Sequence, residues 1–487
     1  MSEVYSLHMG PAACAVDLGD GSERGEYVNQ DYILQTLGRP HRAISLMYCY
    51  YPKDQGWPGR VSEVYASKDV SFAWDYPYDD YFTYKGGIGG DLKGEPFNCM
   101  RDVRSHGQDV LLTITMDPLL EDEYIVAVAK DLRTFGRVLL RVNHEATGDW
   151  FSFTKRTSYE GVAAFFAHVC EIFHREAPNV KLILCLDGYR TLDEEKMGME
   201  DTFLDAIKAA DIESVDRYLA LHWGWPYDVA DEGGNSFARY SVDNIYAVTK
   251  KSAKRYDTIN GVKKPMVLSE LNADGDVTGA YDQEAMMRRF CELLKTDKER
   301  WLNGFTMYQF RDRGRLGLEI EDPNNKDVGI RQPLMDTYKK IIHEEFFSPS
   351  MEKGSAAVLP ATLRWGGSED ADGLLLPLHF DADPVFCEAY FDGDLKDANL
   401  MLELHGRWFY KAPGVECIDL MSAFYDNRLS GATDLDLKIF APPASGENDP
   451  SQGNDWMTNY YCTLNALPRI RIKTRPIVSA EQAGNPS

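Results

Sequence analysis

RVLLRVNHEATGDWFSF, residues 137–153, predicts a buried strand that ends in polar residues. Its apolar run, Val138–Val142, stops at the polar triplet Asn143–Glu145. A second apolar run, Met266–Leu268, is followed after one serine by Glu270. In parallel α/β folds the reactive groups collect at the C-terminal ends of the strands. Two carboxylates at two such ends are therefore expected to face each other at one mouth of the fold.

Short apolar runs alternate with amphipathic stretches from about residue 42 to residue 347. The runs are candidate strands: Ala43–Tyr48, Val70–Trp74, Val110–Thr115, Val138–Val142, Val180–Leu186, Tyr218–His222, Pro265–Ser269 and Gly304–Gln309. Helical periodicity appears between or after them: Tyr124–Phe135, Glu160–Glu176, Thr202–Ala210, Val242–Arg255, Gln283–Leu294 and Leu334–Phe346. This alternation predicts a (β/α)8 TIM barrel. A doubly wound sheet would need a Gly-rich phosphate loop after its first strand, and Tyr48–Pro52 contains no glycine.

The pattern changes near residue 347. Helical periodicity stops, and short strand-like runs separated by Gly, Asp and Pro begin, which predicts an antiparallel β-sandwich. We therefore expect a catalytic barrel with an N-terminal extension at residues 1–347 and a β-sandwich accessory domain at residues 348–487. Residues 1–40 are expected to add an edge strand or to cap the barrel floor.

Aromatic residues of the C-terminal domain have two interpretations. They can form a carbohydrate platform or fill the core, and the core is favoured because a domain of this size needs several large side chains inside. The residues concerned are Trp365, Trp408, Phe409 and Tyr410.

The net charge of −25 restricts the partners of the chain. Nucleic acids and anionic membranes select clustered Lys and Arg, so neither is expected as a partner. An acidic protein favours a neutral or cationic substrate. No apolar run is long enough to predict a membrane span.

Nine cysteines, an odd number, show no metal-ligand spacing. Several lie inside apolar runs, where a free thiol behaves as a small hydrophobic group. These features, and a first segment without an apolar signal region, predict a cytoplasmic protein, or a secreted one if a signal peptide has been removed.

The two carboxylates predict the chemistry of glycosidic bond cleavage. A retaining glycosidase needs one protonated carboxyl and one ionised nucleophile about 5 Å apart. Strands 4 and 7 of a barrel can aim Glu145 and Glu270 into the mouth at such a distance. We expect a raised pKa at Glu145, because the negative charge of Glu270 penalises its ionisation.

Residues 141–150 resemble the Arg-x-x-His-Glu-x-x-Gly-x-Trp motif of glycoside hydrolase family 26, a family of clan A barrels. The family consists mostly of endo-β-mannanases, with some β-xylanases and β-glucanases. The resemblance covers the barrel only and implies that Glu145 is the acid/base and Glu270 the nucleophile. It also implies that His144 helps to hold the sugar or the nucleophile, and that Trp150 lines the cleft. A sister family within the clan is the alternative.

Clan A barrels usually orient the nucleophile with a Tyr or His of the sixth strand. His222 or Tyr227 can fill this role here, and His222 is favoured because it ends the apolar run. Further aromatic and polar residues at strand ends suit a hydroxyl-rich ligand. The remaining predicted substrate contacts are Asn143, Trp74, Asp75, Trp223, Trp225 and Tyr308.

Structural interpretations stand beside these functional ones. A Glu after an apolar strand often starts the next helix, and His144 can be a satisfied core histidine. Asp187 can belong to the cleft or to a turn. Asn272–Asp276 has the alternate oxygens of a calcium loop but lacks the distal Glu, so a solvated loop is favoured.

The sequence thus predicts a retaining β-glycoside hydrolase that acts on a β-mannan, β-glucan or β-xylan type of carbohydrate, without cofactor and without metal. A non-catalytic carbohydrate-binding barrel is the alternative from another class. A metal-dependent lyase or isomerase on the same barrel is a third possibility.

Overall fold

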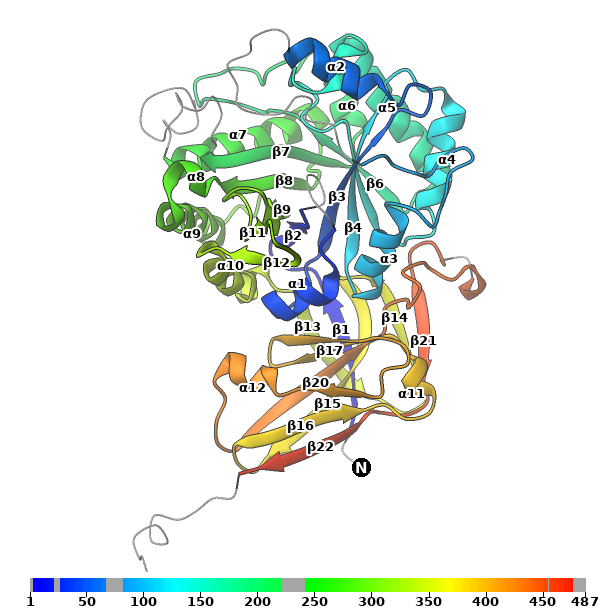
Figure 1. Ribbon diagram of the computed structural model, residues 1–487, viewed down its shortest axis with the longest axis vertical. Coiled ribbons are helices and arrows are strands. Elements are labelled where there is room, and N and C mark those ends of the chain that lie inside the picture. The colour runs from blue at the N-terminus through cyan, green and yellow to red at the C-terminus, as the bar shows by residue number, and fades with distance from the viewer. Residues whose placement is uncertain (1–2, 22–26, 67–81, 221–240, 454, 476–487) are drawn as a thin grey trace, which may run out of the picture.

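The computed structural model describes residues 3–21, 27–66, 82–220, 241–453 and 455–475. Its larger domain is a closed barrel of parallel strands (Figure 1). The strands follow in chain order: β2 (Ala15–Gly19), β3 (Ala43–Tyr50), β4 (Asp109–Met116), β5 (Val138–Val142), β6 (Val180–Cys185), β7 (Ile212–Ala220), β8 (Met266–Ala273) and β9 (Gly304–Met307). The predicted TIM barrel is confirmed.

The first barrel strand differs from the prediction. It is β2, which pairs with β3 on one side and β9 on the other and so closes the barrel. The segment Val70–Trp74 lies outside the described residues, and the barrel closes without it. The barrel has β2, which was not predicted, and its eight strands do not include Val70–Trp74, which was. The number of strands before β5 is therefore as predicted, so Glu145 still follows the fourth strand and Glu270 still lies on the seventh.

Helices surround the barrel (Figure 1). They are α1 (Gln30–Leu37), α2 (Trp57–Ala66), α3 (Phe97–Ser105), α4 (Asp122–Leu132), α5 (Tyr159–Glu176), α6 (Leu204–Ala209), α7 (Val242–Asn260), α8 (Gly275–Thr278), α9 (Ala280–Thr296) and α10 (Leu334–Ile342), with 3-10 turns η1 (Ser152–Lys155) and η2 (Glu345–Phe347). In α5, Ser158 caps the first turn, and the buried stripe from Val162 to Phe173 packs on the strands. No described helix is both long and apolar enough to cross a bilayer.

The second domain is a β-sandwich with an eight-stranded and a three-stranded sheet, and its apolar core lies between the two. The large sheet contains β1 (Tyr5–Gly10), β13 (Ser350–Ala356), β14 (Ala361–Gly367), β15 (Asp370–Phe380), β17 (Leu400–Leu404), β18 (Arg407–Lys411), β20 (Thr433–Phe440) and β21 (Tyr460–Leu464). The small sheet contains β16 (Pro384–Tyr390), β19 (Cys417–Asp419) and β22 (Arg469–Thr474). Short helical turns connect these strands: α11 (Asp394–Asp397), α12 (Ser422–Asn427) and η3 (Pro450–Gln452).

The N-terminal strand, β1, belongs to the large sheet of the sandwich and not to the barrel. β1 lies between β13 and β15 and is antiparallel to both. The chain therefore starts in the sandwich, crosses into the barrel at β2, and returns to the sandwich at β13. A smaller sheet of β10 (Arg311–Asp312), β11 (Glu319–Asp322) and β12 (Asn325–Arg331) follows the last barrel strand.

The sandwich covers the N-terminal end of the barrel strands, which we call the floor (Figure 1). Ser368 donates to the backbone oxygen of Arg42 (2.7 Å), and Asn399 donates to that of Ser105 (2.8 Å). Trp365 is 1% exposed, so it cannot offer a sugar platform. Trp408 and Phe409 are buried as well, and the ring of Tyr410 packs on that of His106 at 3.7 Å.

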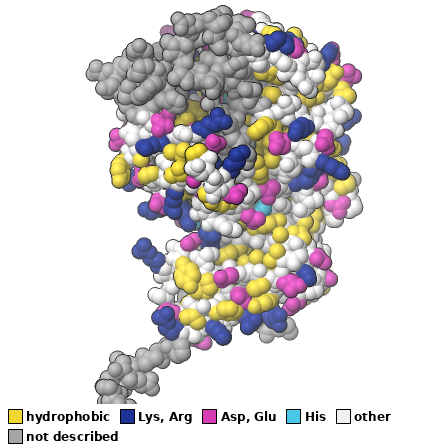
Figure 2. All heavy atoms as spheres, viewed as in Figure 1, with side chains coloured by type: hydrophobic (Ala, Val, Ile, Leu, Met, Phe, Trp, Pro, Cys, Tyr) yellow, Lys and Arg dark blue, Asp and Glu magenta, His cyan; other side chains and the backbone are white. Residues whose placement is uncertain are grey.

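Figure 2 shows Lys and Arg scattered among Asp and Glu over the described atoms of one face. All nine cysteines are free thiols, and seven of them are buried. Their burial agrees with a role as small hydrophobic groups.

Candidate active site

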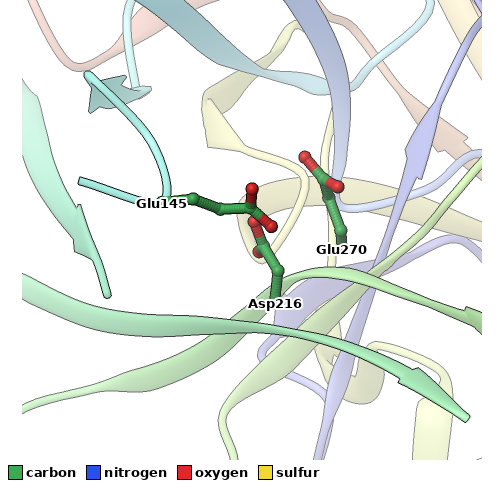
Figure 3. A group of neighbouring side chains, drawn as sticks. All are labelled: Glu145, Asp216 and Glu270. Carbon is green, nitrogen blue, oxygen red and sulfur yellow. The ribbon is translucent and has the colours of Figure 1, made fainter. Parts of the chain in front are cut away.

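Three carboxylates meet at the C-terminal end of the barrel strands, which we call the mouth (Figure 3). They belong to Glu145 just after β5, Asp216 in β7 and Glu270 in β8. One oxygen of each lies within 4.8 Å of the others. The structure thus brings together the predicted pair, Glu145 and Glu270, and adds Asp216, which the sequence did not single out.

The end of β5 turns sharply to aim Glu145 into the mouth. Asn143 and Glu145 both have positive φ angles, +50° and +48°. The side-chain oxygen of Asn143 accepts a hydrogen bond from the backbone N–H of Met116 (2.7 Å), which holds this turn against β4. Asn143 is 2% exposed and shapes the strand end, and its contact with substrate stays a prediction.

His144 is also buried. Its ring packs against that of Phe151 with centroids 4.4 Å apart. Burial, followed by the positive charge of Arg141, holds the pKa of His144 well below its usual range, so the ring is neutral. The buried ring helps to shape the end of β5, and its role in holding the sugar or the nucleophile stays a prediction.

Arg141 joins two of the carboxylates from below. Its guanidinium lies 2.9 Å from Glu270 Oε1 and 3.3 Å from both oxygens of Asp216. Its Nε donates to Thr113 Oγ1 (2.8 Å), which fixes the plane of the group. Arg141 is fully buried, and among the described residues it is the one cationic side chain that pairs with these carboxylates.

Tyr218 holds the other oxygen of Glu270. Its hydroxyl donates to Oε2 at 2.5 Å. This is the role predicted for His222 or Tyr227, which lie outside the described residues, and the structure shows that Tyr218 can fill it. Tyr308, predicted to contact substrate, packs edge-on against Tyr218, with ring centroids 5.8 Å apart.

Trp150 acts on Glu145 directly. Its indole N–H donates to Glu145 Oε2 (2.8 Å), and the side chain is partly exposed. Trp150 was predicted to line the cleft, and the structure shows in addition that it contacts the carboxylate of Glu145. The other predicted contacts lie outside the described residues: Trp74, Asp75, His222, Trp223, Trp225 and Tyr227.

Two of the carboxyls have raised pKa values. Burial raises the pKa of Glu145 most, and the charges of Asp216 and Glu270 raise it further, whereas the bond from Trp150 lowers it. Burial and the charge of Glu270 raise the pKa of Asp216 to about 7, although Arg141 opposes the shift. The expected raised pKa of Glu145 is present, but burial and Asp216 contribute more to it than Glu270 does.

Three converging carboxylates can also hold a divalent cation. Arg141, however, contacts two of them from within the barrel and neutralises part of their charge. A guanidinium at this distance would repel a second positive ion. The arrangement therefore favours proton transfer and nucleophilic attack by the carboxylates over metal binding.

The solvated loop favoured for Asn272–Asp276 is wrong, because Asn272 lies in β8 and both Asn272 and Asp274 are buried. Asp274 caps α8 by accepting from the N–H of Asp276 (2.8 Å), and the Asn272 amide donates to two backbone oxygens. Asp187 pairs with Arg190 at 3.0 Å near the end of β6. Its charge also raises the pKa of Glu145, so it lies within electrostatic reach of the site.

No family model matches the sequence, and no curated protein matches it. Solved structures with a similar fold include the catalytic domain of a family 26 endo-β-1,4-mannanase from a Bacillus species (TM-score 0.43, 12% identity, 69% of this chain and 87% of that one). Two others are a family 51 α-L-arabinofuranosidase from Bifidobacterium longum (0.42, 9%, 90% and 100%) and a β-xylosidase from Caulobacter crescentus (0.42, 13%, 89% and 97%). At TM-scores below 0.5, these likenesses leave the function of the chain to be inferred from its site.

Proposed function

We propose that this chain is a retaining β-glycoside hydrolase, with Glu145 as acid/base and Glu270 as nucleophile. The observation that carries the proposal is the distance between their carboxylates, whose nearest oxygens lie within 4.8 Å. Retaining enzymes hold the two carboxyl groups about 5–5.5 Å apart, whereas inverting enzymes need about 6.5–9.5 Å to admit a water molecule.

The surroundings suit a division of roles between the two acids. Glu145 keeps a proton because its pKa is raised, so it can protonate the departing glycosidic oxygen. Glu270 receives hydrogen bonds from Arg141 and Tyr218, which orient one of its oxygens for attack on the anomeric carbon.

The reaction then proceeds in two displacements. Glu270 forms a bond to the anomeric carbon as the bond to the leaving oxygen breaks and Glu145 transfers its proton to that oxygen. Glu145, now ionised, takes a proton from water, which attacks the same carbon and releases Glu270. Two inversions at one carbon give net retention.

The substrate class follows from the motif at residues 141–150 and from the acidity of the chain. We propose a neutral β-linked glycan of the mannan, glucan or xylan type. Asp216 acts here as a positioning residue, because its charge raises the pKa of Glu145 and its carboxylate holds Arg141.

The test uses aryl β-glycosides and β-mannan, β-glucan and β-xylan, with the anomer of the first product followed by NMR. The wild type should release the β-anomer, and Glu145→Gln and Glu270→Gln should each lose activity at least about 10³-fold while unfolding like the wild type. Wild-type-like turnover by either variant, or an inverted product, would reject the proposal. Oligosaccharide binding without turnover would favour a non-catalytic barrel, and activity lost on chelation would favour a metal enzyme.

A further inference from the structure

Strand β8 contains one extra residue just before Glu270. Val215 and Asp216 are consecutive in β7. Their partners in β8 are Leu268 and Glu270, so Ser269 is left without a partner in this register. The pairing of β8 with β9, on its other side, shifts by one residue in the same interval. Both neighbouring strands therefore place a β-bulge at this point of β8.

The bulge decides on which side of the barrel wall Glu270 lies. Val267 belongs to a small apolar cluster to which several barrel strands contribute, so it faces the inside of the barrel. Leu268 belongs to the larger core that the strands share with the surrounding helices. Side chains alternate along a regular strand, which would place Glu270 on the helix side with Leu268. The extra residue reverses the alternation, and the carboxylate of Glu270 joins the other two in the mouth (Figure 3).

Ser214 of β7 binds the extra residue. Its Oγ accepts a hydrogen bond from the backbone N–H of Ser269 (3.2 Å) and lies 2.6 Å from the hydroxyl oxygen of Ser269. Both serines are fully buried. The extra residue of a bulge is left out of the ladder, and a buried N–H that loses its backbone acceptor needs another one. A single side chain thus holds the main chain and the side chain of the bulged residue.

One face of β7 therefore acts on Glu270 at two levels. Ser214 and Tyr218 lie four residues apart in β7, so their side chains point to the same side of the strand. Ser214 holds the backbone immediately before Glu270, and Tyr218 holds its carboxylate. The bond from Tyr218 requires that the bulge has already turned Glu270 inward.

We propose that Ser214 is a positioning residue for the reaction, because its hydroxyl stabilises the bulge that turns Glu270 into the mouth. It acts through the backbone of Ser269 and Glu270 and touches none of the reacting atoms. The inference rests on the proposed function, since it takes Glu270 as the nucleophile. It adds a residue on which the alignment of that nucleophile depends, and a displacement of about 1 Å can cost about 10²-fold in rate.

The test compares two serine variants with the wild type on the best aryl β-glycoside. Ser214→Ala removes both bonds, so kcat should fall about 10- to 100-fold while KM changes less than about threefold. Ser269→Ala keeps the backbone N–H and its bond to Ser214, so it should lose less activity than Ser214→Ala. Loss in the reverse order would contradict a role of Ser214 in holding the backbone.

Ser368→Ala is the matched control at the floor, where it removes a buried serine hydroxyl that bonds to the backbone oxygen of Arg42. It should lower the thermal unfolding temperature and leave kcat unchanged. The rate at which a 2-deoxy-2-fluoro glycoside labels Glu270 should fall about 10- to 100-fold in Ser214→Ala and stay unchanged in Ser368→Ala. Wild-type kcat and labelling rate in folded Ser214→Ala would overturn the inference, and so would equal losses in both variants.

Hydrogen exchange supplies a readout that needs no activity. The peptide that covers Met266–Ala273 should exchange at least about tenfold faster in Ser214→Ala, because the N–H of Ser269 loses its acceptor, whereas Ser368→Ala should match the wild type. If the wild type turns over no glycoside, the proposed function fails and exchange alone decides the inference. Faster exchange would then support Ser214 as the residue that holds Glu270 in the mouth, and unchanged exchange would overturn it.

Discussion

The two ends of the barrel both bury charged residues, but the charges are balanced at the floor and in excess at the mouth. At the floor, Arg42 pairs with Asp17 through Nε (2.9 Å), and Asp109 lies 3.5 Å from Arg104 and 3.3 Å from Arg137. At the mouth, three carboxylates converge around the single guanidinium of Arg141.

The pKa values follow this difference. Burial raises the pKa of Asp109 at the floor, but three arginines oppose the shift. At Glu145 the neighbouring carboxylates add to the effect of burial. Charges that are matched indicate structure, and charges that remain in excess in a cleft indicate chemistry.

The largest effect is expected at the mouth, from Arg141→Met. The change leaves Asp216 and Glu270 without their shared cation and removes one of the two hydrogen bonds that orient Glu270, so that only Tyr218 still holds it. We expect kcat/KM to fall about 10²- to 10³-fold, as when an organising charged donor is removed from an active site. Steady-state kinetics on the best aryl glycoside measures this, and a loss of less than a few-fold would remove Arg141 from the site.

Arg42→Met makes the matched change at the floor. It leaves Asp17, which is 1% exposed, as an unpaired buried charge. The free energy of unfolding should fall by about 3–5 kcal/mol, while kcat/KM of the folded fraction stays unchanged. Urea unfolding together with kinetics tests both parts, and a loss of activity per folded molecule would contradict the separation of the two ends.

Asp216→Asn should change how stability depends on pH. The pKa of Asp216 in the folded chain, about 7, lies above its unfolded value of 3.8, so the folded state holds a proton that the unfolded state releases. The free energy of unfolding of the wild type should therefore fall as pH rises from about 4 to 7. The variant should fall less steeply, because only the share of Asp216 is removed and Glu145 still holds a proton in the folded state. Denaturation at pH 4.5 and pH 8 measures it, and equal slopes in the two proteins would speak against a buried protonated Asp216.

Trp150→Phe should give the smallest of these effects. The bond from its indole N–H favours ionised Glu145, so removal of the bond raises the pKa of Glu145 further. The basic limb of the kcat/KM profile should move to higher pH, and kcat/KM at its optimum should fall about tenfold. A basic limb that stays in place would show that Trp150 does not act on the ionisation of Glu145.

Much of the barrel could be predicted because its strands are almost purely apolar. The apolar runs in β5, β6 and the first half of β8 stand out in this way, and the glutamates that follow the runs of β5 and β8 came from the pattern. β2 could not be recognised, because it is short and Asp17, paired with Arg42, interrupts its apolar run. The pairing of β1 with β13 joins segments far apart in the chain, for which a local pattern contains no signal.

Charged residues within a strand also limited the prediction of the site. β7 contains the buried charges Glu213, Asp216 and Arg217, so only its last residues look like a strand. For this reason the predicted strand began at Tyr218, and the candidates for the partner of Glu270, His222 and Tyr227, lie outside the described residues. Asp216 had no signal of its own, although its position two residues before Tyr218 places both side chains on the same face of β7.

The most direct test of the account is to trap the intermediate on Glu270. The wild type is incubated with the 2-deoxy-2-fluoro derivative of its best aryl β-glycoside, and the intact chain and its peptides are weighed by mass spectrometry. We predict one glycosyl group per chain, attached to the peptide that contains Glu270, and none on Glu270→Gln. Label on another residue, or an active wild type that forms no covalent adduct, would contradict the assignment of Glu270 as the nucleophile.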